Sequence, residues 1–89
     1  MIKGTTTDGF NYEIDEAVYD DWELIEDLAS LESGDISATV RVMKRLLGDQ
    51  QFAALKEHAR DPETGRVKTS VMLKVQHEIM TMEGPGKNS

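Results

Sequence analysis

The chain has 89 residues, a formal net charge of −7 and no cysteine. A chain of this length makes at most one domain with a small core, so part of its stability often comes from a partner or from a homo-oligomer. The missing cysteines exclude disulfides and thiolate metal sites, and no apolar run approaches the roughly 18 residues of a membrane span. The N-terminus carries no signal-peptide pattern.

A β-hairpin is predicted at residues 2–14. Asp8-Gly9 between two β-prone runs is typical of a tight type I′ turn, which requires positive φ at both central residues. After the turn, Phe10, Tyr12 and Ile14 alternate with polar residues, as in a strand with one buried face. A two-stranded hairpin is marginally stable alone, so we expect these three side chains to lie on a helix.

The first long helix is predicted at about residues 20–33. Asp20 is expected to cap it, with Glu23 three positions later completing a capping box. Gly34 follows at a position where a left-handed C-cap is common. The helical spacing predicts an inward stripe formed by Trp22, Ile25, Leu28, Ala29 and Glu32, widened by Leu24 and Leu31.

Two further helices are predicted on either side of Gly48, at about residues 36–47 and 50–60. Asp35 is expected to cap the former and Asp49 the latter, with Gly48 between them as a stop. The inward side chains are predicted to be Ile36, Val40, Met43 and Leu47 in the former and Phe52, Leu55 and Ala59 in the latter.

The last helix is predicted at about residues 69–82, after a turn at residues 61–65, and residues 84–89 are predicted to form a flexible tail. Thr69 or Ser70 is expected to cap this helix. Its inward residues are predicted to be Val71 or Met72, Val75, Ile79 and Met82. The predicted fold is mainly α, with about four short helices and a small N-terminal β-hairpin in one domain, residues 1–83.

Residues that could carry catalysis or bind a metal are few. His58 and His77 have no third ligand at a matching spacing, and His77-Glu78 lacks the second histidine of a zinc-protease motif. Asp61-Pro62-Glu63 lacks the glycine and distal glutamate of a calcium loop. No phosphate-binding glycine loop precedes a helix, and no nucleophile elbow is present. We therefore expect no catalytic site, cofactor or metal.

The charges are unevenly distributed along the chain. Residues 1–35 hold eleven acids and one base, whereas residues 36–89 hold six acids and nine bases. Nucleic acid would be repelled by the first part, so a basic protein surface is the better partner; a solvated, solubilising helix face is the alternative.

Adaptable apolar side chains near the end of the last helix are the candidate interface. Met80 and Met82, next to Ile79, can adapt to varied apolar partners, since thioether side chains are flexible and polarisable. A role as core filler is the alternative, and it is the better interpretation for Met43 and Met72.

Four short strings occur in an order that is found in a known family. They are Asp8-Gly9-Phe10 running on to Ile14-Asp15, then Asp20-Asp21-Trp22-Glu23-Leu24-Ile25, then Arg45-Leu46-Leu47-Gly48-Asp49-Gln50 with Leu55-Lys56-Glu57-His58, and finally Gly65-Arg66-Val67 before the last helix. Together these strings, which span roughly residues 8–83, resemble the tail assembly chaperones of long-tailed siphophages and related prophages.

The resemblance implies a non-catalytic chaperone that binds the long, mostly helical tape measure protein, keeps it soluble and helps to recruit tail tube subunits. It also implies a location in the bacterial host cytoplasm and absence from the mature virion. The family commonly makes a longer second product by −1 ribosomal frameshifting. Pro85-Gly86-Lys87 can be encoded CCG GGA AAA, which contains a slippery heptamer, so we expect slippage there; a solvated tail is the alternative.

Two other functions remain open from the sequence. A small DNA-associated phage regulator is suggested by the Gly48-Asp49 junction, which resembles a helix-turn-helix preceded by Arg41, Lys44 and Arg45. Residues 50–60 carry only Lys56 and Arg60 as bases, which weighs against that function. A head–tail connector component of the virion is the other alternative.

Overall fold

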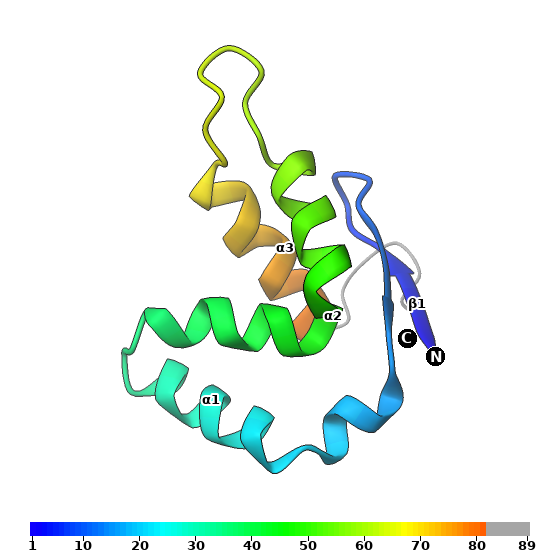
Figure 1. Ribbon diagram of the computed structural model, residues 1–89, viewed down its shortest axis with the longest axis vertical. Helices are drawn as coiled ribbons and strands as arrows, with labels where there is room; N and C mark the ends of the chain where they lie inside the picture. The colour runs from blue at the N-terminus through cyan, green and yellow to red at the C-terminus, as the bar shows by residue number, and fades with distance from the viewer. Residues whose placement is uncertain (82–89) are drawn as a thin grey trace.

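The computed structural model describes residues 1–81, which form a β-hairpin, a short 3-10 helix and three α-helices (Figure 1). The elements in chain order are β1 (Ile2–Thr5), β2 (Asn11–Ile14), η1 (Glu16–Asp20), α1 (Trp22–Glu32), α2 (Ser37–His58) and α3 (Thr69–Thr81). The predicted mainly helical fold with an N-terminal antiparallel hairpin is therefore confirmed. The predictions for Met82 and for residues 84–89 lie outside the described residues.

The predicted number of helices is wrong by one. The two predicted helices, at residues 36–47 and 50–60, are found as the two halves of a single element, α2 (Ser37–His58), because they meet at Gly48 with no connecting loop. Gly48 has φ 78° and ψ 165°, so α2 bends there and its two halves run in different directions (Figure 1). Gly48 interrupts the helix, as expected, but it does not create a loop.

The hairpin is present, but its turn differs from the prediction. Ile2 pairs with Ile14 and Gly4 with Tyr12. The Gly9 N–H donates to the Thr6 carbonyl at 3.0 Å, so Thr7 and Asp8 are the central residues of the turn and Gly9 follows with φ 93°. This is a three-residue hairpin loop ending in a left-handed glycine, and the predicted type I′ turn centred on Asp8-Gly9 is wrong.

The helix starts show which capping predictions hold. Asp21, not Asp20, caps α1, because its Oδ1 accepts the Glu23 N–H at 2.9 Å. Asp35 does cap the start of α2, where its Oδ1 accepts the Ser37 N–H at 3.1 Å. Thr69 and Ser70 are the first two residues of α3, so neither is the expected cap.

The inward faces of α1 and of the first half of α2 are rotated from their predicted positions. Trp22 and Ile25 are 72% and 46% exposed, whereas Leu24, Leu28 and Leu31 face the rest of the protein as predicted, and Asp27 faces it with them. Ile36 and Val40 are 83% and 48% exposed, whereas Met43 and Leu47 are buried as predicted. The spacing of apolar residues alone did not reveal that a carboxylate, Asp27, belongs to the α1 interface.

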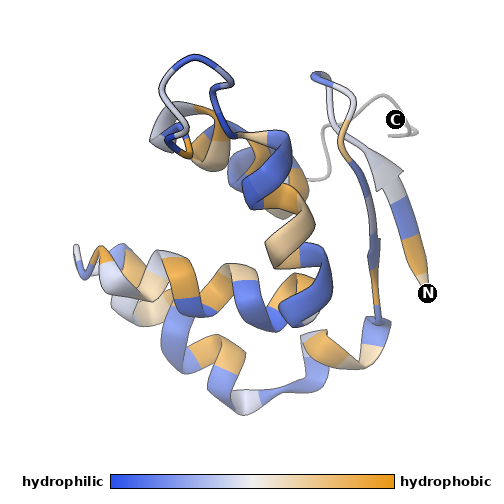
Figure 2. Cartoon of the chain, turned by 45° about the horizontal axis from the view of Figure 1, so that its top comes forward, coloured by the Kyte–Doolittle hydropathy of each residue, from blue (hydrophilic) through white to orange (hydrophobic). Residues whose placement is uncertain are grey.

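One core joins the hairpin to all three helices. In Figure 2, hydrophobic and hydrophilic residues alternate along α1 and α2, as expected for helices with one buried face. The buried apolar cluster consists of Phe10, Tyr12, Ile14, Leu24, Val42, Met43, Leu46, Leu47, Phe52, Leu55, Val75 and Ile79. Phe10, Tyr12 and Ile14 therefore lie on the helical part of the protein, as the hairpin pattern predicted.

Candidate functional site

The three residues predicted to bind a partner have different environments. Ile79 is only 1% exposed and belongs to the core, so it is not available to a partner in this structure. Met80 is 42% exposed. Met82 lies outside the described residues. Of the two predicted residues that the structure describes, Met80 is the one that a partner can reach.

Met80 lines an apolar groove that runs along α1, and we call it the α1 groove. Its volume is about 340 Å³, and it brings together side chains from β1, η1, α1, α2 and α3. The lining residues are Ile2, Tyr19, Leu24, Ile25, Leu28, Leu46 and Met80. Leu24 and Leu46 are buried at its floor, while Tyr19, Ile25 and Met80 remain exposed around it.

The segment that forms one side of the α1 groove is strongly acidic. Residues 15–32, which supply Tyr19, Leu24, Ile25 and Leu28, hold eight acids and no base. Within the described residues, Asp20, Glu26 and Glu32 form no ion pair. Negative charge therefore accompanies this apolar surface, and a partner with basic flanks would be favoured there.

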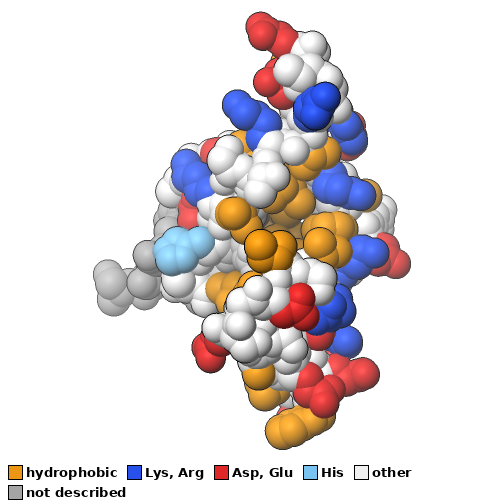
Figure 3. All heavy atoms as spheres, turned by 90° about the vertical axis from the view of Figure 1, so that its left-hand side faces the viewer, with side chains coloured by type: hydrophobic (Ala, Val, Ile, Leu, Met, Phe, Trp, Pro, Cys, Tyr) orange, Lys and Arg blue, Asp and Glu red, His pale blue; other side chains and the backbone are white. Residues whose placement is uncertain are grey.

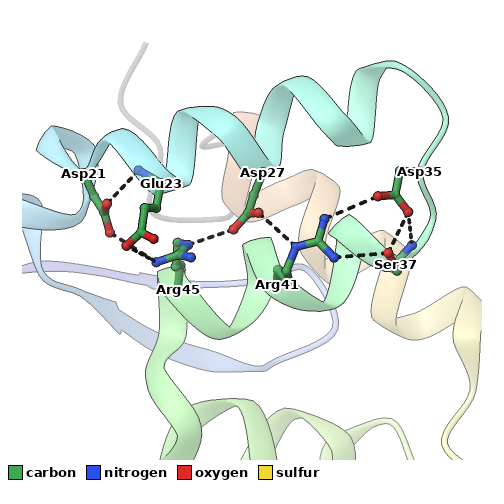
Figure 4. Close-up of polar contacts among 7 residues, drawn as sticks. All are labelled: Asp21, Glu23, Asp27, Asp35, Ser37, Arg41 and Arg45. Carbon is green, nitrogen blue, oxygen red and sulfur yellow. Dashed lines mark hydrogen bonds and ion pairs between the residues drawn. The ribbon is translucent and has the colours of Figure 1, made fainter.

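Asp27 positions α1 by holding two arginines of α2 (Figure 4). Its Oδ1 accepts from Arg41 Nε at 2.9 Å and its Oδ2 from Arg45 Nε at 2.7 Å. The hydrogen bonds from Arg45 and then Arg41 hold the pKa of the Asp27 carboxyl below its usual value. Further carboxylates contact the same two arginines, namely Asp21, Glu23 and Asp35.

This network determines which residues line the α1 groove. Because Asp27 faces α2, Ile25, two residues earlier on the helix, faces away from α2 and reaches solvent. The pairing also neutralises Arg41 and Arg45, two of the three bases that made residues 36–47 resemble the start of a DNA-binding motif.

Two further titratable side chains, Glu78 and His58, contact the hairpin loop. Glu78 accepts from the Thr7 N–H at 2.7 Å and from the Thr7 hydroxyl at 2.8 Å, which ties α3 to the hairpin loop. His58 Nε2 lies 3.2 Å from Asp8, and its ring centroid is 5.4 Å from that of Phe10. Among residues 1–81, no group of three or more His, Cys, Asp or Glu side chains is arranged to hold a metal ion.

No family model, curated protein or solved structure matches the chain. In the part of the chain that the structure describes, no helix is long and apolar enough to cross a membrane.

Most of the α1 groove was missed by reasoning from sequence. Ile2 and Tyr19 gave no signal, because a lone apolar residue in a short strand or turn is ordinary. Ile25 and Leu28 were noticed, but as core residues of a helical stripe. The informative signal was Asp27, a carboxylate that stands between Leu24 and Leu28 on the helix, together with Arg41 and Arg45, which lie one helical turn apart in the following helix.

Proposed function

We propose that this protein is a phage tail assembly chaperone that holds a helix of the tape measure protein in the α1 groove. The observation that carries the proposal is an open apolar groove beside an acidic helix. The identity of the partner comes from the four strings that resemble the chaperone family. The tail tube protein is a second proposed partner on the same ground.

The partner segment should itself be helical. The α1 groove is lined mainly by helical residues, whose backbone N–H and C=O groups are already bonded within their helices. Along these helical residues a partner gains no main-chain hydrogen bonds and must satisfy its own, which an amphipathic helix does. Apolar anchors at i, i+3 or i+4 and i+7 would enter the groove, with basic residues toward α1.

Two other functions have less support. A DNA-associated regulator would need Arg41 and Arg45 at a phosphate backbone, whereas both pair with carboxylates of the same chain (Figure 4). Absence of DNA binding in a low-salt gel shift would exclude the function of a DNA-associated regulator. A head–tail connector component would remain in purified virions, whereas a chaperone would not.

Capture of co-expressed tape measure fragments tests the proposal. Ile25→Asp and Met80→Asp each place a charge on the wall of the α1 groove and should reduce capture at least about tenfold, since a buried unpaired charge is costly. Val40→Asp is the matched control, because Val40 is as exposed as Ile25 and lies outside the groove. Equal capture by Ile25→Asp and the unmodified protein would contradict the proposal.

A further inference from the structure

A second apolar groove lies between α2 and α3, and we call it the α2–α3 groove. It has a volume of about 350 Å³ and shares no lining residue with the α1 groove. Its lining residues are Ile36, Thr39, Val40, Met43, Phe52, Val67, Thr69, Met72 and Leu73. Figure 3 shows hydrophobic side chains gathered at the centre of a face that α2 and α3 help to form.

The groove has an apolar floor as well as an apolar rim. Met43 and Phe52 line it although they are buried, whereas Ile36, Val40 and Leu73 line it and remain exposed. A side chain must therefore enter the groove to reach its floor. A flat surface such as a lipid bilayer would contact only the rim, so a partner with projecting apolar side chains fits better.

Basic side chains lie beside this groove. The Lys44 and Lys56 ammonium groups lie 6.0 and 5.4 Å from the centroid of the Phe52 ring. Lys68 and Lys74 directly follow the lining residues Val67 and Leu73 in the chain. In Figure 3, Lys and Arg side chains adjoin the hydrophobic cluster on two sides.

These four lysines differ from three of the four arginines of the protein. Arg41, Arg45 and Arg60 each pair with a carboxylate, but none of the four lysines forms an ion pair within residues 1–81. None of the residues lining the groove is charged. The lysine charges are thus available to a partner, and they are opposite in sign to the charge beside the α1 groove.

We infer that the α2–α3 groove binds an acidic amphipathic helix of a second protein. Most of its lining residues belong to α2 and α3, whose backbone groups are already hydrogen bonded, so an added strand would gain no pairing there. Apolar side chains at i, i+4 and i+7 of the partner occupy the groove, and flanking Glu or Asp residues meet the lysines. The inference does not depend on the tape measure protein, because it concerns a separate groove with opposite charge.

The test uses a fluorescent helical peptide of about 15 residues, with Leu at i, i+4 and i+7 and Glu on both flanks. A second peptide carries Lys in place of Glu. Anisotropy titrations of the full chain should show the Glu peptide binding at least about tenfold more tightly than the Lys peptide. That preference should weaken between about 50 and 300 mM salt, since exposed charges are screened.

Substitutions in each groove test whether the Glu peptide binds to the α2–α3 groove. Val40→Asp should weaken binding of the Glu peptide at least about tenfold, and Ile25→Asp, in the other groove, should leave it unchanged. Because Val40→Asp adds a charge near the core, the double variant Lys44→Gln with Lys56→Gln provides a second test. It alters only exposed lysines and should reduce the preference for the Glu peptide.

Several results would overturn the inference. Equal affinity for the two peptides, no binding of the Glu peptide at low salt, or binding insensitive to Val40→Asp and to the lysine variants would each do so. Sedimentation that shows self-association abolished by Val40→Asp would assign the groove to a second copy. Binding to phosphatidylserine vesicles, lost in the lysine variants, with no binding of the Glu peptide would assign it to a lipid surface.

Discussion

Asp27 is the residue on which the orientation of α1 depends. Its carboxylate, little exposed, receives hydrogen bonds from two guanidinium groups of α2. Removal of the carboxylate would leave the two guanidinium groups without this partner. The resulting loss of unfolding free energy is larger than the net stabilisation that the intact pair provides. Any change at Asp27 should therefore affect both the stability of the protein and the shape of the α1 groove.

Asp27→Asn should lower the midpoint of thermal unfolding, because it leaves Arg41 and Arg45 facing a neutral amide. Glu26→Gln is the matched control, since Glu26 is an exposed carboxylate on the same helix. Circular dichroism melts at neutral pH measure both variants. Equal midpoints for the two would show that the Asp27 bridge contributes nothing specific.

The same carboxyl predicts how stability depends on acid. The pKa of Asp27 is lowered in the folded protein, so its contribution is fully present above the ordinary aspartate pKa of about 4 and is lost as the pH falls through the lower, folded value. Denaturant titrations between about pH 6 and pH 2 should show a steeper loss of unfolding free energy for the unmodified protein than for Asp27→Asn. Parallel pH profiles would contradict this assignment.

Gly4 is required by the residue opposite it in the hairpin. Gly4 pairs with Tyr12, and a Cβ at Gly4 would overlap the Tyr12 ring. Gly4→Ala should therefore cost about 1–3 kcal/mol of unfolding free energy, measured by denaturant titration. In a Tyr12→Ala background the same substitution should cost much less, because the clash is gone. An equal loss of unfolding free energy in both backgrounds would show that the Tyr12 ring is not the cause of the destabilisation.

At the scale of the elements, the bend in α2 brings the hairpin and α3 to the same core. Gly48 has φ 78° and ψ 165°, a region that is open essentially to glycine alone, and a Cβ added there would meet no side chain or backbone from elsewhere in the fold within 4 Å. Gly48→Ala should thus cost about 1–3 kcal/mol through backbone strain and not through a clash.

A synthetic chain with d-alanine at position 48 is the control for that prediction. The mirror image of the Gly48 conformation is ordinary extended backbone for an L-residue, so d-alanine fits it without strain. Denaturant titration should place this chain at or above the stability of the unmodified protein. A loss as large as that of Gly48→Ala would show that the added methyl group, and not φ, is responsible.

The elements were predictable where local chemistry determines them. Alternation in Phe10, Tyr12 and Ile14 predicted a strand on helices, and Asp35 and Gly48 predicted a helix start and a helix interruption. The orientation of α1 was not predictable, because rotation of a helix depends on its partner. The apolar spacing favoured Trp22 and Ile25, whereas the Asp27 pairing with α2 turned both toward solvent.

At the scale of the whole molecule, opposite charges both hold the protein together and divide its surface. Arg41 and Arg45 pair with acids of the first 35 residues, which joins the two differently charged parts of the chain. Asp20 and Glu26, unpaired within residues 1–81, directly follow residues that line the α1 groove, and Lys44 and Lys56 lie beside Phe52 of the α2–α3 groove. The uneven charge seen in the sequence thus becomes two apolar grooves with different electrostatic surroundings.

The candidate site was predictable only in part for a related reason. Met80 was identified from the type of side chain and its place near a helix end. The other lining residues come from separate elements, such as Ile2 in β1 and Leu46 in α2, and only the tertiary arrangement brings them together. The chemistry of the surface could be read from the sequence, but its location could not.

The central claim is that the α1 groove receives a helix of the partner. Methyl NMR of the full chain, titrated with a helical fragment of a tape measure protein, tests it directly. The account predicts that the Ile25, Leu28 and Met80 methyl signals shift together on binding while those of Val40 and Leu73 stay in place. Shifts confined to Val40 and Leu73, or no methyl shifts at saturating fragment, would contradict it.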